Sequence, residues 1–256
     1  MKRSMIFFLW LLASILSYGQ EKVKSTTADP REMTPEMTEP KAPLVKVIQP
    51  AQKVGLPPSD TIILFDGTDV TKEWEGGQGN PAKWIVKEGE LICGGGPLTT
   101  KRKFNDFQLH IEWKTPSVVE GEGQGRGNSG IFLQGQYELQ ILDSYNNPTY
   151  PIGQAGSIYK QYAPLVNVSR KPGEWQVYDI IYTAPRFTEN SKGYFTPPRV
   201  TVLHNGVLIQ NNISLRGPTV YIGIPEYSIA PHGSASLLLQ DHGNPVAFKN
   251  IWIREL

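Results

Sequence analysis

The feature that most constrains the fold is an alternation of apolar and polar residues that recurs in short stretches over residues 61–256. Between residues 107 and 114, Phe, Leu, Ile and Trp occupy every second position, and polar residues fill the positions between them. Side chains alternate between the two faces of a β-strand, so this period predicts strands with one buried face. No stretch of useful length has a helical period. Short strands separated by turn residues predict an all-β sandwich or jelly roll of antiparallel sheets.

Turn residues place several hairpins within this pattern. Glu88-Gly89 interrupts an alternating stretch at 84–93, and Gly135-Gln136 separates the next pair of predicted strands. Asn205-Gly206 is the strongest hairpin signal in the chain, because both central residues of a type I′ turn need a positive φ. The predicted strands around and after these turns cover residues 129–134, 137–142, 176–182, 199–203, 207–210, 236–241 and 247–254.

The N-terminal segment predicts export rather than fold. Lys2 and Arg3 precede an apolar stretch at residues 5–15, and small residues at 17 and 19 suit a signal peptidase. The apolar stretch is shorter than the roughly 20 residues of a membrane-spanning helix. We therefore expect a cleaved signal peptide at 1–19, with an uncleaved anchor as the alternative. Residues 20–59 are rich in Pro, Thr and Glu and predict a linker, so the folded domain covers 60–256.

Charge and cysteine content narrow the class of protein further. The net charge is +1, and no basic stripe is visible, so we expect no nucleic-acid partner. No membrane span is expected after signal cleavage. Cys93 is the single cysteine, which leaves an exported domain without disulfides and without a thiolate-rich zinc site. A buried strand position is the expected place for Cys93.

Polar side chains on the solvent side of the predicted strands form the candidate functional surface. The apolar positions expected to face one core are Leu109, Ile111, Trp113, Ile131, Leu133, Leu139 and Ile141. The opposite face then carries His110, Glu112, Lys114, Asn128, Phe132, Gln134, Glu138 and Gln140, with Gln240 and His242 together near the C-terminus. This surface is enriched in carboxylate, amide and imidazole groups, which hydrogen-bond sugar hydroxyls. It therefore predicts a carbohydrate site.

The stretch from Glu138 to Asp143 is the most informative part of that surface. Glu138 and Gln140 lie on one face, roughly 6.6 Å apart, whereas Asp143 falls on the other face unless a β-bulge turns it. Jelly-roll glucanases carry three carboxylates at the corresponding first, third and sixth positions of a bulged catalytic strand. Because Gln140 and Asp143 replace two of those carboxylates, ordinary retaining hydrolysis is in doubt. The alternative is a polar strand that ends in a turn capped by Asp143.

Two neighbouring segments add candidate ligands. Arg126 and Asn128, beside glycines that permit close approach, can donate to a sugar or an oxyanion, although a plain turn into a strand would look the same. His242 can act as a general acid or base near neutral pH, and Tyr159 can donate or stack against a sugar ring. Both also fit structural roles. The tryptophans expected in the core are Trp74, Trp84, Trp175 and Trp252.

Taken together, these motifs resemble the 3-keto-disaccharide hydrolase domain family of the concanavalin A-like lectin/glucanase superfamily. They run in order from about Asp60 to the end of the chain: LFDGT at 64–68, GEL at 89–91 after Trp84, FQLHIEW at 107–113, GNSGIF at 127–132, YELQILDS at 137–144, GEW at 173–175, NG at 205–206, LQDHG at 239–243 and FKNI at 248–251. The resemblance implies a concanavalin A-like jelly-roll β-sandwich of two antiparallel sheets. It also implies a bacterial protein that is periplasmic or extracellular.

The resemblance further implies an enzyme that cleaves glycosides oxidised at C3 of the sugar. A C3 ketone acidifies the C2 proton, so a base can remove it, the C1 aglycone can leave, and water can add back. Glu138 or Glu112 is then the candidate base, and His242 or Tyr159 the acid. The candidate substrate ligands are Arg126, Asn128, Gln140, Asp143, Tyr159 and Gln240. The segment 186–198 is longer than a simple hairpin turn in this family and so leaves the substrate preference open.

Two other classes of protein remain open at this point. A carbohydrate-binding module or lectin could use the same amides and aromatics without chemistry, and a structural surface protein could carry the same polar face simply solvated. Clustered carboxylates beside an imidazole favour the enzyme. We predict no cofactor; a structural calcium ion is possible because jelly rolls of this kind often hold one, but no loop with regularly spaced acids supports it. Convergence of Glu138, Glu112 and His242 in one pocket would favour the enzyme, and their dispersion over several faces would favour the other two classes.

Overall fold

The structure is a computed structural model, and it describes residues 53, 55–187, 194–227 and 232–256. The chain divides into two compact units, Met1–Lys46 and Val47–Leu256, and every described residue lies in the second. The predicted signal peptide and nearly all of the predicted linker lie outside the described residues. Within the described ranges, no helix is long and apolar enough to cross a membrane.

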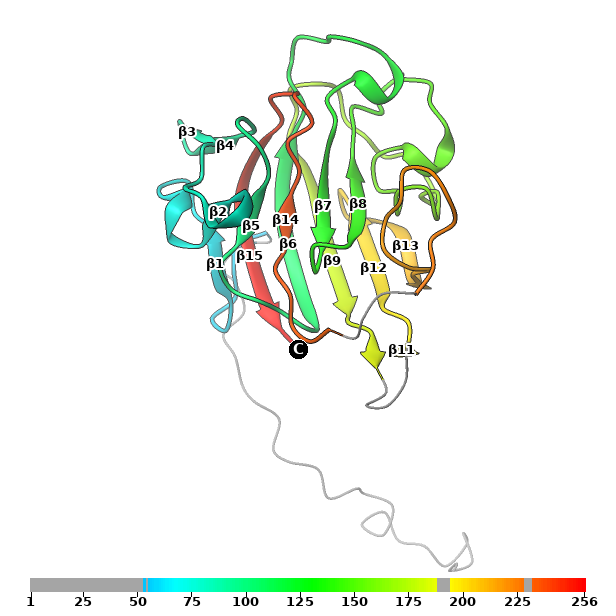
Figure 1. The fold of residues 1–256 in the computed structure, drawn as a ribbon. Helices are drawn as coiled ribbons and strands as arrows, with labels where there is room; N and C mark the ends of the chain where they lie inside the picture. Colours follow the sequence, from blue (N-terminus) through cyan, green and yellow to red (C-terminus); the bar gives the residue numbers. More distant parts are fainter. Residues whose placement is uncertain (1–52, 54, 188–193, 228–231) are drawn as a thin grey trace, which may run out of the picture. The chain divides into compact units, whose positions relative to one another are not determined.

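The predicted all-β sandwich is confirmed. One sheet has eight strands in the order β13-β12-β9-β6-β15-β4-β3, with β1 paired to β15, and the other has five in the order β2-β5-β14-β7-β8. The eight-stranded sheet comprises β1 (Ile62–Phe65), β3 (Ile85–Lys87), β4 (Glu90–Ile92), β6 (Phe107–Lys114), β9 (Gln176–Thr183), β12 (Arg199–His204), β13 (Val207–Ser214) and β15 (Ala247–Glu255). The five-stranded sheet comprises β2 (Trp74–Gly76), β5 (Leu98–Thr100), β7 (Ser129–Leu133), β8 (Tyr137–Ile141) and β14 (Leu238–Leu239). All pairings are antiparallel, and Figure 1 shows the two sheets face to face.

The remaining described elements are short. β10 (Arg186–Phe187) and β11 (Tyr194–Thr196) form a separate two-stranded sheet. Four 3₁₀ turns occur in the described part of the chain: η2 (Val70–Lys72), η3 (Gly77–Gly79), η4 (Gly123–Gly125) and η5 (Pro151–Gly153). The described parts of the segment 186–198 thus pair with each other in antiparallel fashion.

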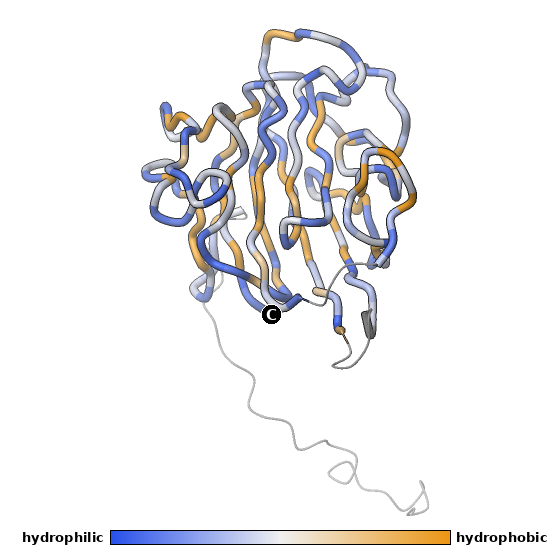
Figure 2. The backbone as a smooth tube through the Cα atoms, in the orientation of Figure 1, coloured by the Kyte–Doolittle hydropathy of each residue, from blue (hydrophilic) through white to orange (hydrophobic). Residues whose placement is uncertain are grey.

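The core lies between the two sheets and consists of the residues that the alternation assigned to it. All seven predicted core positions of β6, β7 and β8 are buried. In Figure 2, apolar and polar residues alternate along β6 and β8. Cys93 is also buried. Three of the four tryptophans expected in the core are buried, but the prediction for Trp175 is wrong. Its half-buried ring lies on the surface, where Lys114 and Lys249 place their ammonium groups 4.7 and 4.1 Å from the ring centroid.

The predicted hairpin turns are present with the expected backbone. Glu88 and Gly89 have φ values of 53° and 79°, and Asn205 and Gly206 have 52° and 81°. These left-handed pairs join β3 to β4 and β12 to β13. Positive φ at both central residues gives the twist that two-residue hairpins need.

Candidate functional site

The outer face of the five-stranded sheet carries the polar residues that periodicity placed beside one another. On β8, Glu138 and Gln140 point away from the core, and they pair across the ladder with Phe132 and Gly130 of β7. The amide N–H of Gln240, just after β14, donates to the carbonyl of Gly130 at 2.9 Å. β7, β8 and β14 therefore place these side chains on one surface.

Loops close this surface into a cavity of about 440 Å³, which we name the Glu138 pocket. The long connection from β8 to β9 supplies one wall, the segment after β13 supplies a second, and the residue two positions after Gln240 supplies the rim. The lining residues are Gln124, Asn128, Glu138, Gln140, Tyr150, Tyr159, Lys160, Thr219, Tyr221, Gln240 and His242. Six of the predicted site residues thus converge: Glu138, His242, Asn128, Gln140, Tyr159 and Gln240.

Glu138 has an unusual environment for a carboxylic acid. Its side chain is buried, with 4% of the residue exposed, and within the described residues its carboxyl group forms no hydrogen bond or ion pair. Burial disfavours the charged form and raises the pKa of Glu138 to about 8. A carboxyl group that is buried but not used for structure is typical of a catalytic acid or base.

A glycine on the neighbouring strand makes room for this carboxyl group. A Cβ atom at Gly130 would lie 2.6 Å from Oε1 of Glu138 and 3.2 Å from its carboxyl carbon. A side chain at position 130 would therefore displace the carboxyl group. The glycine that suggested close approach in the sequence accommodates the side chain of Glu138.

Amide side chains form the floor of the pocket beside Glu138. Nε2 of Gln140 donates to Oδ1 of Asn128 and to Oε1 of Gln124, at 3.3 Å in both cases. Nδ2 of Asn128 donates to the Gln124 carbonyl at 2.7 Å, which fixes the orientation of this group. Oε1 of Gln140 and Oε1 of Gln240 are buried and accept no hydrogen bond within the described chain. Both can accept from the hydroxyls of a bound sugar.

Two tyrosines and a lysine form the opposite wall. The hydroxyls of Tyr150 and Tyr159 are 2.8 Å apart. Burial, together with the neighbouring Tyr150, raises the pKa of Tyr159 above its usual range, so this phenol remains protonated and able to donate. The ammonium group of Lys160 lies 4.2, 5.4 and 5.8 Å from the ring centroids of Tyr150, Tyr221 and Tyr159.

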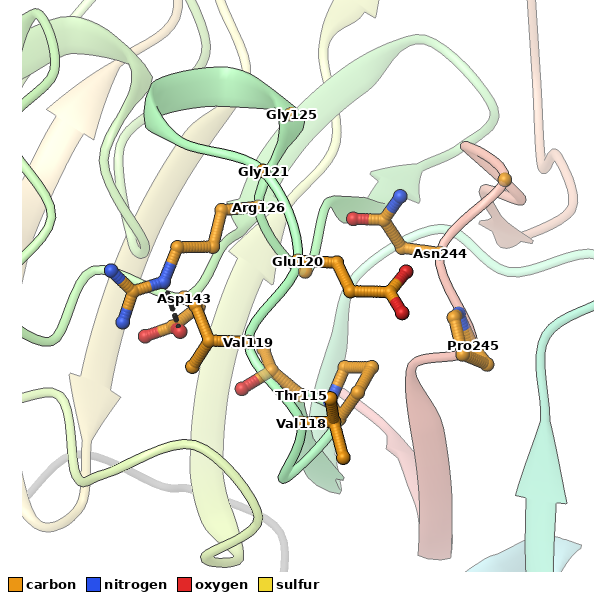
Figure 3. Close-up of a pocket in the computed structure, with 13 residues that line it drawn as sticks. Thr115, Val118, Val119, Glu120, Gly121, Gly125, Arg126, Asp143, Asn244 and Pro245 are labelled. Carbon is orange, nitrogen blue, oxygen red and sulfur yellow. Dashed lines mark hydrogen bonds and ion pairs between the residues drawn. The ribbon is translucent and has the colours of Figure 1, made fainter.

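Arg126 and Asp143 do not reach the Glu138 pocket, which corrects the expectation for both. They form an ion pair of 2.6 Å between Nε and Oδ2 and line a separate cavity of about 280 Å³ (Figure 3). β8 ends at Ile141 and pairs with β7 without a register shift, so Asp143 lies after the strand and is not part of a bulged strand. Asp143 instead accepts from the Tyr145 amide, as the alternative of a capped turn predicted.

Glu112 also lies elsewhere, because β6 belongs to the eight-stranded sheet. Oε1 of Glu112 accepts from Asn250 at 2.8 Å and lies 3.8 Å from Nε2 of His110, and Lys249 lies 3.4 Å from Oε2. The ion pair with His110 outweighs burial and lowers the pKa of Glu112 to about 2. The expectation that Glu112 shares a surface with Glu138 is therefore wrong, since alternation assigns a face but does not say which sheet.

His242 and the loop residues complete the description of the pocket. His242 is exposed at the rim, as the sequence around Gln240 suggested. The sequence did not identify Gln124, Tyr150, Lys160, Thr219 and Tyr221. All five lie outside the predicted strands, so periodicity carried no information about them. No group of three or more His, Cys, Asp or Glu residues that could hold a metal ion occurs in the described ranges, and we assign no metal ligands.

Comparison with known proteins connects this geometry to a family. Residues 60–254 match the family described as the 3-keto-alpha-glucoside-1,2-lyase-like domain. The chain belongs to this family. A 3-keto-disaccharide hydrolase of Bacteroides thetaiotaomicron is a relative of this lyase-like domain, 27% identical over 244 residues that cover 76% of this chain and 78% of the relative.

Solved structures agree with the family assignment. A candidate glycosyl hydrolase from Parabacteroides distasonis is 52% identical and has a TM-score of 0.82. The match covers 88% of this chain and 97% of that one. A second candidate glycosyl hydrolase from the same organism has a TM-score of 0.56 at 22% identity, covering 77% of this chain and 94% of that one, and it supports the fold alone. The lyase-like domain described here is thus a member of a carbohydrate-acting family.

Proposed function

We propose that this lyase-like protein cleaves glycosides, disaccharides among them, whose sugar carries a ketone at C3. The observation that carries the proposal is the buried carboxyl group of Glu138, which has no partner among the described residues and lines a pocket of hydrogen-bonding side chains. The family description and the B. thetaiotaomicron relative support a 3-keto sugar as the substrate class.

The pocket argues against the usual two-carboxylate mechanism of glycosidases. Retaining and inverting enzymes both place a pair of acids across the glycosidic bond. Among the residues that line the Glu138 pocket, Glu138 is the single carboxylic acid. Elimination needs one base only, so the composition of the pocket suits removal of a proton from C2.

Each step of the proposed reaction has candidate groups in the pocket. Glu138 removes the C2 proton, and the electron pair delocalises onto the C3 oxygen. When the bond from C1 to the aglycone oxygen breaks, the pair forms the C1–C2 double bond, the C3 carbonyl returns, and Tyr159 or His242 protonates the leaving oxygen. Water then adds its hydroxyl to C1, its remaining proton restores the acid that protonated the aglycone, and Glu138 returns its proton to C2. The amides of Asn128, Gln140 and Gln240 hold the sugar hydroxyls.

The raised pKa of Glu138 suits this role. A carboxyl group with a pKa of about 8 gives, once ionised, a stronger base than an exposed carboxylate. A stronger base removes a proton from carbon more readily. The group must lose its own proton before it can act. Activity should therefore increase as the pH approaches 8.

The decisive experiment replaces Glu138 with Gln, which keeps the shape of the side chain and removes the base. We expect the rate of cleavage of a 3-keto-glucoside to fall by about 10²- to 10⁴-fold. Analysis of the products over time measures this rate. In D₂O, the wild-type protein should also incorporate deuterium at C2 of the product. Glu112→Gln is the matched control and should retain activity, because Glu112 lies on the other sheet.

Undiminished cleavage by Glu138→Gln would reject Glu138 as the base. Tight binding of sugars by a wild-type protein that turns over none of the 3-keto substrates would support the binding-module alternative instead.

We also propose that the protein is exported, on the strength of the signal-like residues 1–19. Cell fractionation followed by N-terminal sequencing tests this directly. A mature protein that begins close to residue 20 in the periplasm or medium is the expected result, and an intact N-terminus in the cytoplasm would contradict it.

A further inference from the structure

Lys160 is a charged residue of the Glu138 pocket to which the proposed reaction has given no role. It is the only lysine or arginine among the lining residues. Its ammonium group makes no ion pair or hydrogen bond with any described residue, and tyrosine rings surround it. A positive charge that has no acidic partner among the described residues and shares a pocket with a buried acid is available to a ligand.

The backbone at Lys160 has a conformation that residues other than glycine rarely adopt. Its φ is 61°, in the left-handed region. Non-glycine residues in that region cluster at functional sites, where the surrounding structure holds them. Here the Lys160 amide donates to the carbonyl of Ile152 at 2.9 Å.

The position of Lys160 is tied directly to the strand that carries Glu138. The amide of Tyr159 donates to the carbonyl of Glu138 at 3.1 Å, and Ile158 forms a bridge with Leu139. The backbone next to Lys160 is therefore fixed relative to the backbone of Glu138. The tyrosine rings hold the ammonium group in turn, because a cation is attracted to the face of an aromatic ring.

Resting on the proposed function, we infer that Lys160 is a catalytic residue that stabilises the negative charge on the C3 oxygen. That charge develops when Glu138 takes the C2 proton and disappears when the aglycone leaves. A fixed ammonium group aimed at a developing anion lowers the barrier without reorganisation during the reaction. This is the role that the sequence suggested for Arg126, which lies in the other cavity. Tyr159 and His242 remain free to protonate the leaving oxygen.

The test compares Lys160→Met with Lys249→Met. Lys249 is a matched control because it also lies over an aromatic ring, that of Trp175, but outside the pocket. We expect Lys160→Met to lower kcat on a 3-keto-glucoside by about 10²- to 10³-fold with little change in KM. Lys249→Met should leave kcat unchanged.

Lys160→Gly provides a second measurement that misfolding cannot imitate. Glycine adopts a positive φ readily, so the loop should keep its course, which a thermal melt can check. The loss of the side chain leaves space in which added ethylammonium should restore kcat in a saturable manner. A structural role for Lys160 would not produce such rescue.

Three results would overturn the inference. The first is an undiminished kcat in Lys160→Met and Lys160→Gly alongside an active wild type. The second is an effect confined to KM. The third is a kcat loss that grows with the pKa of the aglycone, since that dependence marks the acid for the leaving group. A wild-type protein that is inactive on every 3-keto-glucoside overturns the proposed function itself, and this inference with it.

Discussion

Glu138 and Glu112 are two glutamates on the outer faces of two different sheets, and their surroundings push their pKa values in opposite directions. Glu112 has Asn250, His110 and Lys249 as partners, and its pKa falls to about 2. Glu138 is more deeply buried and has no partner for its carboxyl group among the described residues, and its pKa rises to about 8. The first carboxylate stabilises the fold, whereas the second weakens it and is available for chemistry.

His110 extends the contrast to a third titratable group. Burial alone would lower the pKa of His110, but its hydrogen bond to Asp179 and its ion pair with Glu112 outweigh burial and raise the pKa to about 9. Nδ1 of His110 lies 2.6 Å from Asp179, and the ring stacks on Trp252. The region around Glu112 is thus a paired network, and its charges satisfy one another.

The largest expected effect is on stability at alkaline pH. The unfolded chain ionises Glu138 near 4.5 and the folded chain only near 8, so the folded state binds the extra proton between those values. Stability therefore falls as the pH rises from 4.5 to 8, by on the order of 1.4 kcal/mol for each unit of pKa shift. Denaturant unfolding at several pH values should show Glu138→Gln gaining several kcal/mol over the wild type at pH 8. If the free energies of unfolding of the two proteins changed with pH in parallel, Glu138 would not have the raised pKa that distinguishes it from Glu112.

The next effect concerns the rate. If Glu138 must be ionised to act, kcat/KM should rise about tenfold per pH unit well below 8 and level off above it, which is about 50-fold between pH 6 and pH 8, where half of the groups are ionised. Glu112→Gln should reproduce the wild-type profile. A plateau that begins near pH 5 would show that the base titrates as an ordinary carboxyl group.

Acidification should affect Glu112 in the opposite sense. Its folded pKa of about 2 lies below the unfolded value of 4.5, so its contribution is present above pH 4.5 and is lost as the pH falls through 2. We expect Glu112→Gln to remove about 2 kcal/mol of stability at pH 6 and almost none at pH 2, measured by urea unfolding. Equal destabilisation at both values would mean that Glu112 acts through packing rather than charge.

A smaller change tests the space that Gly130 leaves for Glu138. Gly130→Ala should displace the carboxyl group and lower kcat about tenfold, less than the roughly 100-fold that a 1 Å misplacement can cost. Gly94→Ala is the matched control, because a Cβ there meets no atom within 4 Å. Unchanged kinetics in both variants would show that the carboxyl group is free to shift without loss.

The periodicity of the sequence was sufficient for some of these residues and not for others. Glu138 and Gln140 lie side by side in the structure because strand alternation needs no tertiary information. Asp143 lies outside the reach of this rule, because β8 ends at Ile141 and Asp143 belongs to the turn that follows. Glu112 obeyed the alternation too, yet it lies on the other sheet, and sheet membership depends on long-range pairing.

Lys160 shows where reading along the chain reaches its limit. Its place in the pocket depends on hydrogen bonds between a loop and the edge of β8, which no local pattern encodes. Trp175 is the opposite case, a residue wrongly predicted to be buried. An aromatic residue just before a strand suggests a core position, and only the folded structure shows that Lys114 and Lys249 pack on its ring at the surface.

The loop on the edge of β8 has a consequence for solubility. β8 is the last strand of its sheet, and its free edge would be a template for pairing with another chain. Gln140 exchanges backbone hydrogen bonds with Ser157 and Gly156, Tyr159 donates to Glu138, and the hydroxyl of Thr219 accepts from the Glu138 amide. The segments that build the pocket walls therefore also cover this edge of the sheet. Selection for a new substrate can alter side chains of these loops that take no part in the reaction, but shortening the loops would uncover the edge and turn a change of specificity into a loss of soluble protein.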